Sequence, residues 1–157
     1  MTRRATPAFA PTQVLTALIA RNVPFVVVGA LAAVAHGSPL PVAATEVAVA
    51  PGEAEHPRLE EALADLGAVR SSASRSGDIA YDTSGGPLSV HTVAGHGALA
   101  RRAVPMELAP GLMAPVASAR DLMVRAMEAT STQERALIPV LSDILEVDAI
   151  GDHRTNE

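Results

Sequence analysis

Hydrophobic positions in the first part of the chain switch between helical and strand spacing. Apolar residues recur at helical spacing over 11–22 and predict a helix there. The β-branched and aromatic run PFVVVG then predicts a buried strand that ends on Gly29. The small residues of 30–35 favour a short helix, which the following His-Gly pair ends. The pattern therefore predicts a strand, a tight glycine turn and a short helix in direct succession.

The rest of the chain predicts further strands and a helical end. Alternation and turn residues predict strands over 46–50, 79–81, 88–93, 104–108 and 112–116. Apolar spacing predicts helices over 55–67, over 118–128 and from about 131 onward. Ser118 and Ser131 each precede an acidic residue by three positions, which is the spacing of a capping box. Pro139 is expected to kink or split the last helix.

These elements predict one α+β domain over residues 11–150, with flexible ends over 1–10 and 151–157. We expect a mixed, partly antiparallel sheet of about four to six strands that is flanked by helices. The C-terminal helices should pack against this sheet. No internal repeat and no long linker indicates a second domain.

The composition excludes several kinds of chemistry. Apolar residues make up 48% of the 157 positions and aromatic residues only 2%, so the core must consist of small and medium aliphatic side chains. Met113, Met123 and Met127 are expected to help fill that core. The chain has no cysteine, and all 12 basic residues are arginine. Disulfides, zinc-thiolate sites, lysine Schiff bases and P-loop lysines are therefore excluded.

The distribution of charge and hydropathy bears on partners and location. The net charge is −5 and no basic run is longer than two arginines, which disfavours general nucleic-acid binding. The longest apolar stretch, 23–35, is too short and too interrupted to span a membrane. The two arginines near the start are not followed by an apolar segment of the secretory type. We therefore expect a cytoplasmic protein that does not bind membranes.

The stretch VPFVVVGALAAVAHGSPLPVAATEVAVAP, followed by a helix that ends ALADLGA, resembles the minimal nucleotidyltransferases, the branch related to abortive-infection toxins. That family has a strand, Gly-Gly or Gly-Ser, a short helix, His-Gly, an Arg-x-Thr loop and then a strand with Asp-x-Asp. SVHTVAG resembles the family's strand with a third Asp, and PVASARDLMVRAMEATSTQERALIPVLSDI resembles its closing helices. The resemblance covers about residues 14–147 and implies a nucleotidyltransferase-like fold.

The resemblance also implies that catalysis is impaired. In active members, the three carboxylates hold divalent metal ions over a nucleoside triphosphate. Glu46, Ala48 and Ser89 occupy the three acidic positions in this chain, so only one carboxylate remains. The family's loop arginine and threonine are replaced by Leu40 or Pro41 and by Ala43 or Ala44. We expect metal-dependent nucleotidyl transfer to be lost or severely weakened, and we assign no catalytic residue.

Some residues remain candidates for binding. A glycine between strand and helix lets a phosphate approach the backbone, so the nucleotide-binding candidates are Gly29, Ala30, His36, Gly37 and Ser38. His36 could instead bond a carbonyl group at the end of its helix. Glu46 is the one candidate metal ligand, and the alternative is a solvent-facing strand residue.

Three other pairs of polar residues have both a functional and a structural interpretation. Asp78 and Asp82 share one face of a strand and are either a second carboxylate pair or surface residues. His91 and His96 lie five residues apart, but no third ligand for a metal is indicated. Arg120 and Arg125 occupy positions where the family has basic residues, which lie either near the nucleotide or on the helix surface.

Three functions stay open. The first is a nucleotidyltransferase-fold protein that has lost catalysis, needs no cofactor and acts as a binding, regulatory or partner-interaction module. The second is an active nucleotidyltransferase that uses Mg²⁺ and a nucleoside triphosphate at Glu46 with Asp78 or Asp82. The third is a structural or oligomerisation module, which would act as a homodimer or with a protein partner.

Overall fold

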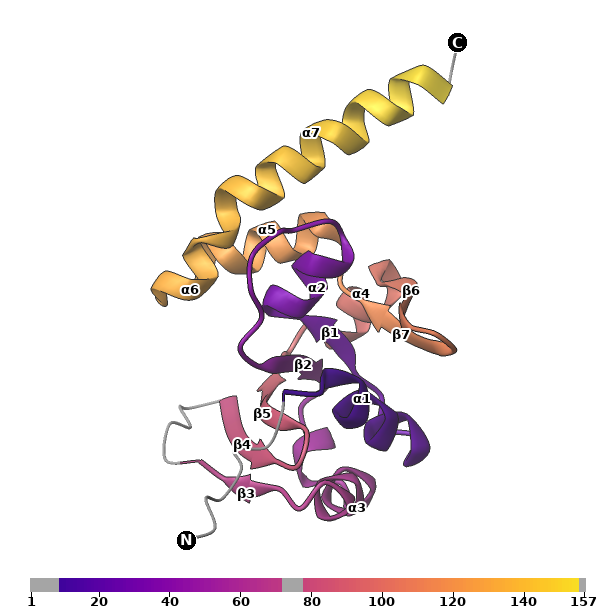
Figure 1. The fold of residues 1–157 in the computed structure, drawn as a ribbon, viewed down its shortest axis with the longest axis vertical. Helices are drawn as coiled ribbons and strands as arrows, with labels where there is room; N and C mark the ends of the chain where they lie inside the picture. The colour runs from indigo at the N-terminus through magenta and orange to yellow at the C-terminus, as the bar shows by residue number, and fades with distance from the viewer. Residues whose placement is uncertain (1–8, 72–77, 156–157) are drawn as a thin grey trace, which may run out of the picture.

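A computed structural model describes residues 9–71 and 78–155 of the chain (Figure 1). Within these residues the strands are β1 (Val26–Val28), β2 (Thr45–Val49), β3 (Val69–Arg70), β4 (Asp78–Thr83), β5 (Gly86–Thr92), β6 (Val104–Ala109) and β7 (Leu112–Val116). The helices are α1 (Pro11–Ala20), α2 (Gly29–Ala35), α3 (Pro57–Asp65), α4 (His96–Arg102), α5 (Ala119–Glu128), α6 (Thr132–Arg135) and α7 (Leu137–Thr155). A single 3₁₀ turn, η1 (Glu53–Glu55), precedes α3.

The described strands form one mixed sheet in the order β3-β4-β5-β2-β1-β7-β6. β2 pairs with β5, and β1 with β7, in parallel; the other pairs are antiparallel. The expected mixed sheet in a single α+β domain is confirmed. The sheet has seven strands, more than expected, because β3 is a two-residue edge strand with exposed side chains and gives no hydrophobic pattern.

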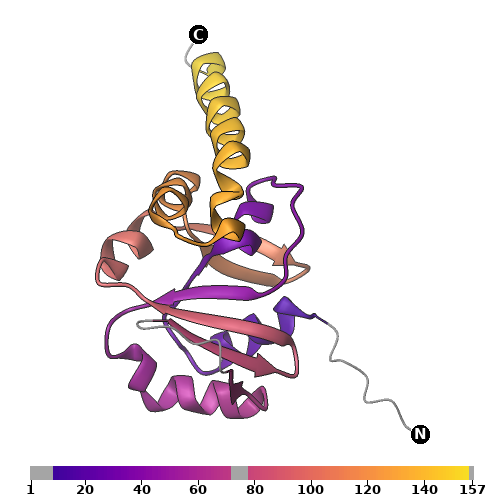
Figure 2. The same cartoon turned by 90° about the vertical axis from the view of Figure 1, so that its left-hand side faces the viewer.

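Helices cover both faces of the sheet (Figure 2). α2, α5, α6 and α7 lie on one face, and α1 and α3 lie on the other. α5 packs against α2 and α7, and α1 packs against α3. α4 connects β5 to β6 and was not predicted, because its seven residues contain one large apolar side chain, Leu99.

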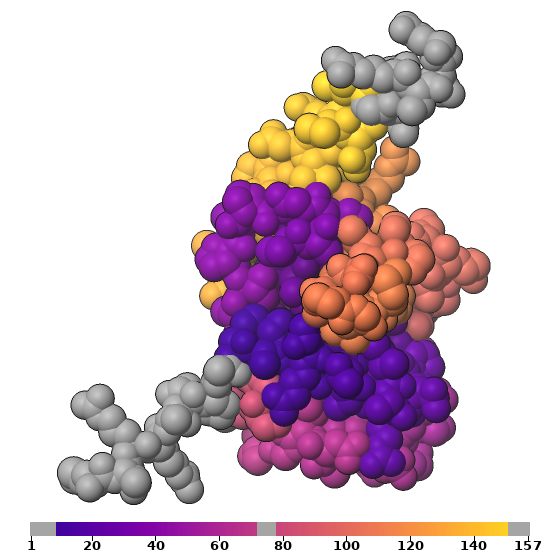
Figure 3. Space-filling view, turned by 45° about the vertical axis from the view of Figure 1, so that its right-hand side comes forward, coloured from indigo at the N-terminus to yellow at the C-terminus, as the bar shows by residue number. Residues whose placement is uncertain are grey.

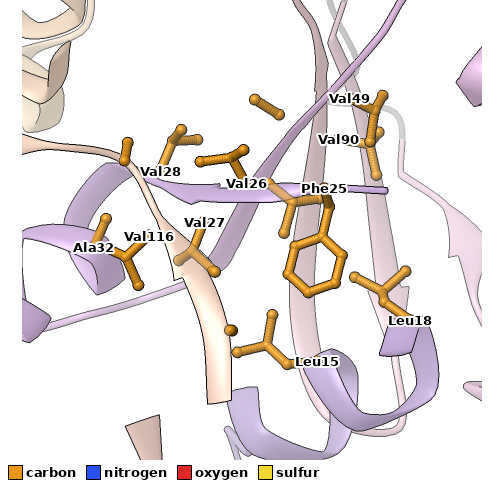
Figure 4. Close-up of a cluster of buried hydrophobic side chains, with 14 of the residues drawn as sticks. Leu15, Leu18, Phe25, Val26, Val27, Val28, Ala32, Val49, Val90 and Val116 are labelled. Carbon is orange, nitrogen blue, oxygen red and sulfur yellow. The ribbon is translucent and has the colours of Figure 1, made fainter. Parts of the chain in front are cut away.

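The core is built almost entirely from aliphatic side chains. β1 is buried on both faces, and Leu15 and Leu18 of α1 point toward it beside Phe25 (Figure 4). The prediction that all three methionines fill the core was wrong. Met123 packs against the core, but Met113 is 53% exposed and Met127 is 66% exposed. Met127 lies on the exposed outer face of α5. The apolar residues of α5 extend beyond the face that packs against the core, so their spacing does not separate Met127 from the buried residues.

Local signals account for the helix boundaries at the C-terminal end. The Ser118 hydroxyl accepts the backbone N–H of Asp121 at 3.1 Å, and the Ser131 hydroxyl accepts that of Glu134 at 3.1 Å. Both predicted caps are confirmed. The last helix is split at Ala136, and Pro139 lies in the first turn of α7, where its missing N–H is not needed.

α7 continues through residues 151–155, which the sequence analysis placed in the C-terminal tail. Figure 1 shows α7 extending away from the body of the protein, and the space-filling view shows its coloured part above the other elements (Figure 3). In the part of α7 before residue 151, Val147 is 67% exposed and Ile150 is 58% exposed. Within the described residues, no helix combines the length and the apolar character needed to cross a bilayer.

Candidate functional site

A cleft of about 700 Å³ lies on the face of the sheet that carries α2 and α5–α7. Side chains of β2, β4 and β5 form its floor. The loop 40–44, which consists entirely of apolar residues, forms one wall. The other wall is the segment 128–137, which includes the end of α5, all of α6 and the start of α7.

Strand register brings the polar floor residues together. β2 and β5 pair in parallel with Glu46 opposite Ser89 and with Ala48 opposite His91. β4 and β5 pair in the antiparallel sense with Asp78 opposite His91. Residues that are directly opposite in a sheet share a face, so all of these side chains project to the cleft side.

His91 joins two carboxylates on this floor. Its Nε2 lies 3.1 Å from Oε1 of Glu46, and its Nδ1 lies 2.8 Å from Oδ1 of Asp78. Burial of His91 acts to lower its pKa, but the hydrogen bonds and negative charges of the two carboxylates outweigh it and raise the pKa above 6.5. The arrangement therefore favours an imidazolium that donates one N–H to each carboxylate.

Glu46 also lies directly against the glycine turn between β1 and α2. Gly29 has a φ of +71°, a left-handed conformation that favours glycine. A Cβ at this position would overlap Oε2 of Glu46 and would lie 2.5 Å from its Cδ. The missing side chain of Gly29 thus provides the space for the Glu46 carboxylate.

Glu134 of α6 contributes a further carboxylate from the opposite wall. Burial is the largest cause that raises its pKa, and the negative charges of Glu46 and Asp78 act in the same direction. The positive charges of Arg125 and His91 oppose this shift. The Glu134 carboxylate has no hydrogen-bond or ion-pair partner among the described residues.

The three positions of the family's acidic triad differ in their surroundings. Glu46 and Ser89 line the cleft. Ala48 is fully buried and does not line it. Of the two other candidate carboxylates, Asp78 lines the cleft, whereas Asp82 lies opposite Pro87 toward the other end of β4 and does not.

The five candidates around the glycine turn are mostly outside the cleft. Ala30 lines it, and Gly29 lines a small adjoining pocket. His36 caps the C-terminal end of α2. Its Nε2 lies 2.8 Å from the carbonyl oxygen of Ala117, so this side chain bonds a carbonyl group and does not line the cleft. Gly37 and Ser38 do not line the cleft either, and the Ser38 hydroxyl accepts the N–H of the second residue after it at 3.1 Å.

Sequence reasoning missed two functional residues of the cleft. His91 was weighed only with His96, which is buried at the start of α4 and does not line the cleft. Strand alternation places His91 and Ser89 on one face, a signal that could have identified His91. Glu134 was used only as a helix cap, and nothing in its local pattern indicates the cleft. Of the two arginines weighed, Arg120 is exposed and Arg125 lies in the adjoining pocket.

The residues present do not fit a pair of divalent metal ions. Such a site needs several oxygen ligands from neighbouring positions. Here Ala48 offers none, Ser89 offers a hydroxyl, and Oε1 of Glu46 is hydrogen-bonded to His91. Among the described residues, no group of three or more His, Asp or Glu side chains is arranged to hold a metal ion.

Comparison with known proteins identifies the fold. Neither a protein-family model nor a curated protein sequence matches the chain. The solution structure of the antibiotic-resistance factor ANT(2'')-Ia, an aminoglycoside nucleotidyltransferase, is similar, with a TM-score of 0.57 and 16% sequence identity. The match covers 93% of this chain and 95% of that one.

The fold is nucleotidyltransferase-like. At this level of identity the similarity shows the fold alone. It extends over nearly the whole chain, so the described elements form one nucleotidyltransferase-like domain. The finer resemblance to the minimal, abortive-infection-related branch remains an expectation from the sequence.

Proposed function

We propose that this chain is a nucleotidyltransferase-fold protein that has lost metal-dependent nucleotidyl transfer and acts as a binding module through its cleft. The observation that carries the proposal is the composition of the cleft floor. Ala48 and Ser89 occupy two of the three acidic positions that the family resemblance implies, and the remaining Glu46 is bonded to His91.

The chemistry of the floor supports this loss. Metal ions in a phosphoryl-transfer site neutralise the charge that develops on the transferred group and align the attacking and leaving oxygens. In this chain His91, when protonated, supplies positive charge to Glu46 and Asp78, and its raised pKa favours that form. An imidazolium can balance these carboxylates, but it has no free coordination positions for phosphate oxygens.

The cleft itself supports a binding role. Its volume of about 700 Å³ lies within the range of small-molecule sites in proteins. The similar structure, ANT(2'')-Ia, is described as having substrate-regulated conformation dynamics. A regulatory role for this chain would follow if ligand binding changed the position of the α6–α7 wall.

Isothermal titration calorimetry with Mg²⁺ and each of the four common nucleoside triphosphates tests the loss of catalysis. We expect no metal-dependent binding to the wild-type chain. The Glu46→Gln variant serves as the matched control, because it removes the one remaining carboxylate of the triad. Tight binding that requires Mg²⁺ and disappears in this variant would overturn the proposal.

An active enzyme with a different carboxylate set is the second candidate. The observation that favours it is that Glu46 and Asp78 both line the cleft and share His91. The test is transfer of labelled nucleotide onto tRNA or protein. This candidate requires that Glu46→Ala and Asp78→Asn abolish transfer, and that Asp82→Asn leaves transfer unchanged, because Asp82 does not line the cleft.

An oligomerisation module is the third candidate. Its support is the extended end of α7, where Val147 and Ile150 are exposed. Exposed apolar side chains on one helix can bury area against another protein or a second copy. Light scattering at two protein concentrations tests self-association, and a strict monomer at both would exclude the homodimer.

A further inference from the structure

We propose that the cleft binds a small organic cation with an apolar body, such as an alkyl diamine, polyamine or guanidine. This inference rests on the proposed function, because it assigns a class of ligand to the same cleft. Three features point to this class of ligand: the charges that line the cleft, the unpaired carboxylate on its wall and the apolar character of the facing loop.

The charges that line the cleft are predominantly negative. The carboxylates are those of Glu46, Asp78, Glu128 and Glu134. The cationic group is His91, and both of its ring nitrogens are already bonded to carboxylates. Within the described part of the chain, no arginine lines the cleft, and the sequence contains no lysine. A polyanion such as a free triphosphate would meet like charges there, whereas a cation would meet opposite charges.

Glu134 provides the clearest contact for a cation. Its carboxylate is partly buried and has no partner among the described residues, which is an unfavourable environment for a charged group. An ammonium or guanidinium group beside it would supply the missing charge and the missing hydrogen-bond donors. The second cationic end of a diamine would lie toward the free oxygens of Glu46 or Asp78 on the floor.

The apolar part of the lining specifies the body of the ligand. The loop from Leu40 to Ala44 has no polar side chain. The other wall is mixed, with Ala129, Ala136 and Leu137 among polar residues that include Glu134. Methylene groups buried against these apolar side chains would be removed from water, which stabilises the bound ligand. A small, strongly hydrated metal cation gains nothing from such walls, so the cleft favours an organic cation.

Calorimetric titration with matched probes tests the ligand class. The cationic probes are 1,6-diaminohexane, spermidine and agmatine; the controls of similar length are neutral 1,6-hexanediol and anionic adipate. We expect at least one cationic probe to bind, with an affinity that falls as salt is raised, and we expect no binding of either control. Failure of all three cations, or equal binding of hexanediol, would overturn the inference.

Variants then assign the site. Glu134→Gln preserves size and removes the charge, and we expect it to weaken binding of the cation about tenfold. Glu60→Gln is the matched control, because Glu60 is exposed on α3, which lies on the other face of the sheet. Glu128→Gln is a second test in case Glu134→Gln does not fold. If neither cleft variant weakens binding more than the control does, the inference is wrong.

The outcomes separate this inference from the proposed function. Binding of a cation without binding of Mg²⁺ and nucleotide supports both. If neither kind of probe binds, the ligand class is wrong and the loss of nucleotide binding stands. If Mg²⁺-dependent nucleotide binding is tight, the proposed function fails, and the cation titration decides the ligand class separately.

Discussion

The carboxylate of Glu46 occupies the space that a side chain at residue 29 would need. A Cβ built on Gly29 would overlap Oε2 of Glu46, and the φ of Gly29 is +71°. The glycine turn and the Glu46 side chain are therefore fitted to each other. This contact connects the start of α2 to the floor of the cleft.

Gly29→Ala is expected to destabilise the protein by the cost of a left-handed alanine, about 1–2 kcal/mol, plus the cost of moving Glu46. Chemical denaturation measures the loss. Gly111→Ala is the matched control, because Gly111 has a similar φ of +77° and open space around its Cβ. Its cost should come from backbone conformation alone and should be the smaller of the two.

A double variant separates the two contributions at residue 29. Glu46→Ala removes Oε2 and Cδ and leaves only the Cβ of residue 46, which lies 3.2 Å from the Cβ position at residue 29. Gly29→Ala should therefore cost less in the Glu46→Ala background than in the wild type. Equal costs in both backgrounds would show that the Glu46 side chain moves away freely.

His91 is expected to titrate above pH 6.5, because Glu46 and Asp78 raise its pKa against the effect of burial. The negatively charged Glu134 also faces it across the cleft. NMR of the imidazole resonances measures the pKa directly. Asp78→Asn should lower it, whereas Asp82→Asn, on the same strand but outside the cleft, should leave it unchanged.

The raised pKa of His91 also predicts a pH dependence of stability. Its contribution is fully present below pH 6.5 and is lost as the pH rises through the raised pKa of the folded state. The stability difference between the wild type and His91→Gln should therefore shrink as the pH increases across this interval. Urea unfolding at a series of pH values checks this, and a constant difference would argue against a charged His91.

Glu53 and Arg58 form a second charge pair, away from the cleft. Arg58 Nη2 donates to Oε2 of Glu53 at 2.7 Å, and this bond lowers the pKa of the largely buried Glu53 below 4.5. Stability from this carboxylate is present above pH 4.5 and is lost as the pH falls through the lowered pKa. Arg58→Ala should cost about 1–3 kcal/mol at neutral pH, because it leaves a buried carboxylate without its donor.

Acid titration of stability provides the check on that pair. The wild type should lose more stability than Arg58→Ala between pH 6 and pH 3, because the variant has already lost the interaction that protonation removes. Arg120→Ala is a suitable control, because Arg120 is exposed on α5 and takes part in no ion pair among the described residues.

Acidic residues introduced into the floor at positions 48 and 89 should not be equally tolerated. Ala48 is fully buried, so Ala48→Asp would bury a carboxylate beside a His91 that is already bonded, at a cost of several kcal/mol. Ser89 lines the open cleft, so Ser89→Asp should cost less. Thermal unfolding of both variants measures this order. An Ala48→Asp variant as stable as the wild type would contradict the closed packing around residue 48.

The sequence alone determined the local elements, and it places Ala48 and Ser89 at two positions where the family resemblance implies acidic residues. Periodicity and glycine placement predicted β1, the turn at Gly29 and α2, and serine-acid spacing predicted the caps at Ser118 and Ser131. These signals work because they depend on neighbours within one turn of helix or along one strand. The identity of residue 48 is also plain from the sequence: an alanine side chain cannot coordinate a metal.

Only the tertiary structure decided what the cleft contains. His91 lies 45 residues from Glu46 along the chain, and their contact depends on the parallel register of β2 and β5. Glu134 reaches the same cleft because α5 and α7 place α6 over the sheet. Such long-range placements follow from the packing of whole elements, which no local pattern encodes. The sequence therefore indicated which residues differ from the pattern that the family resemblance implies, and the folded structure showed which residues surround the cleft.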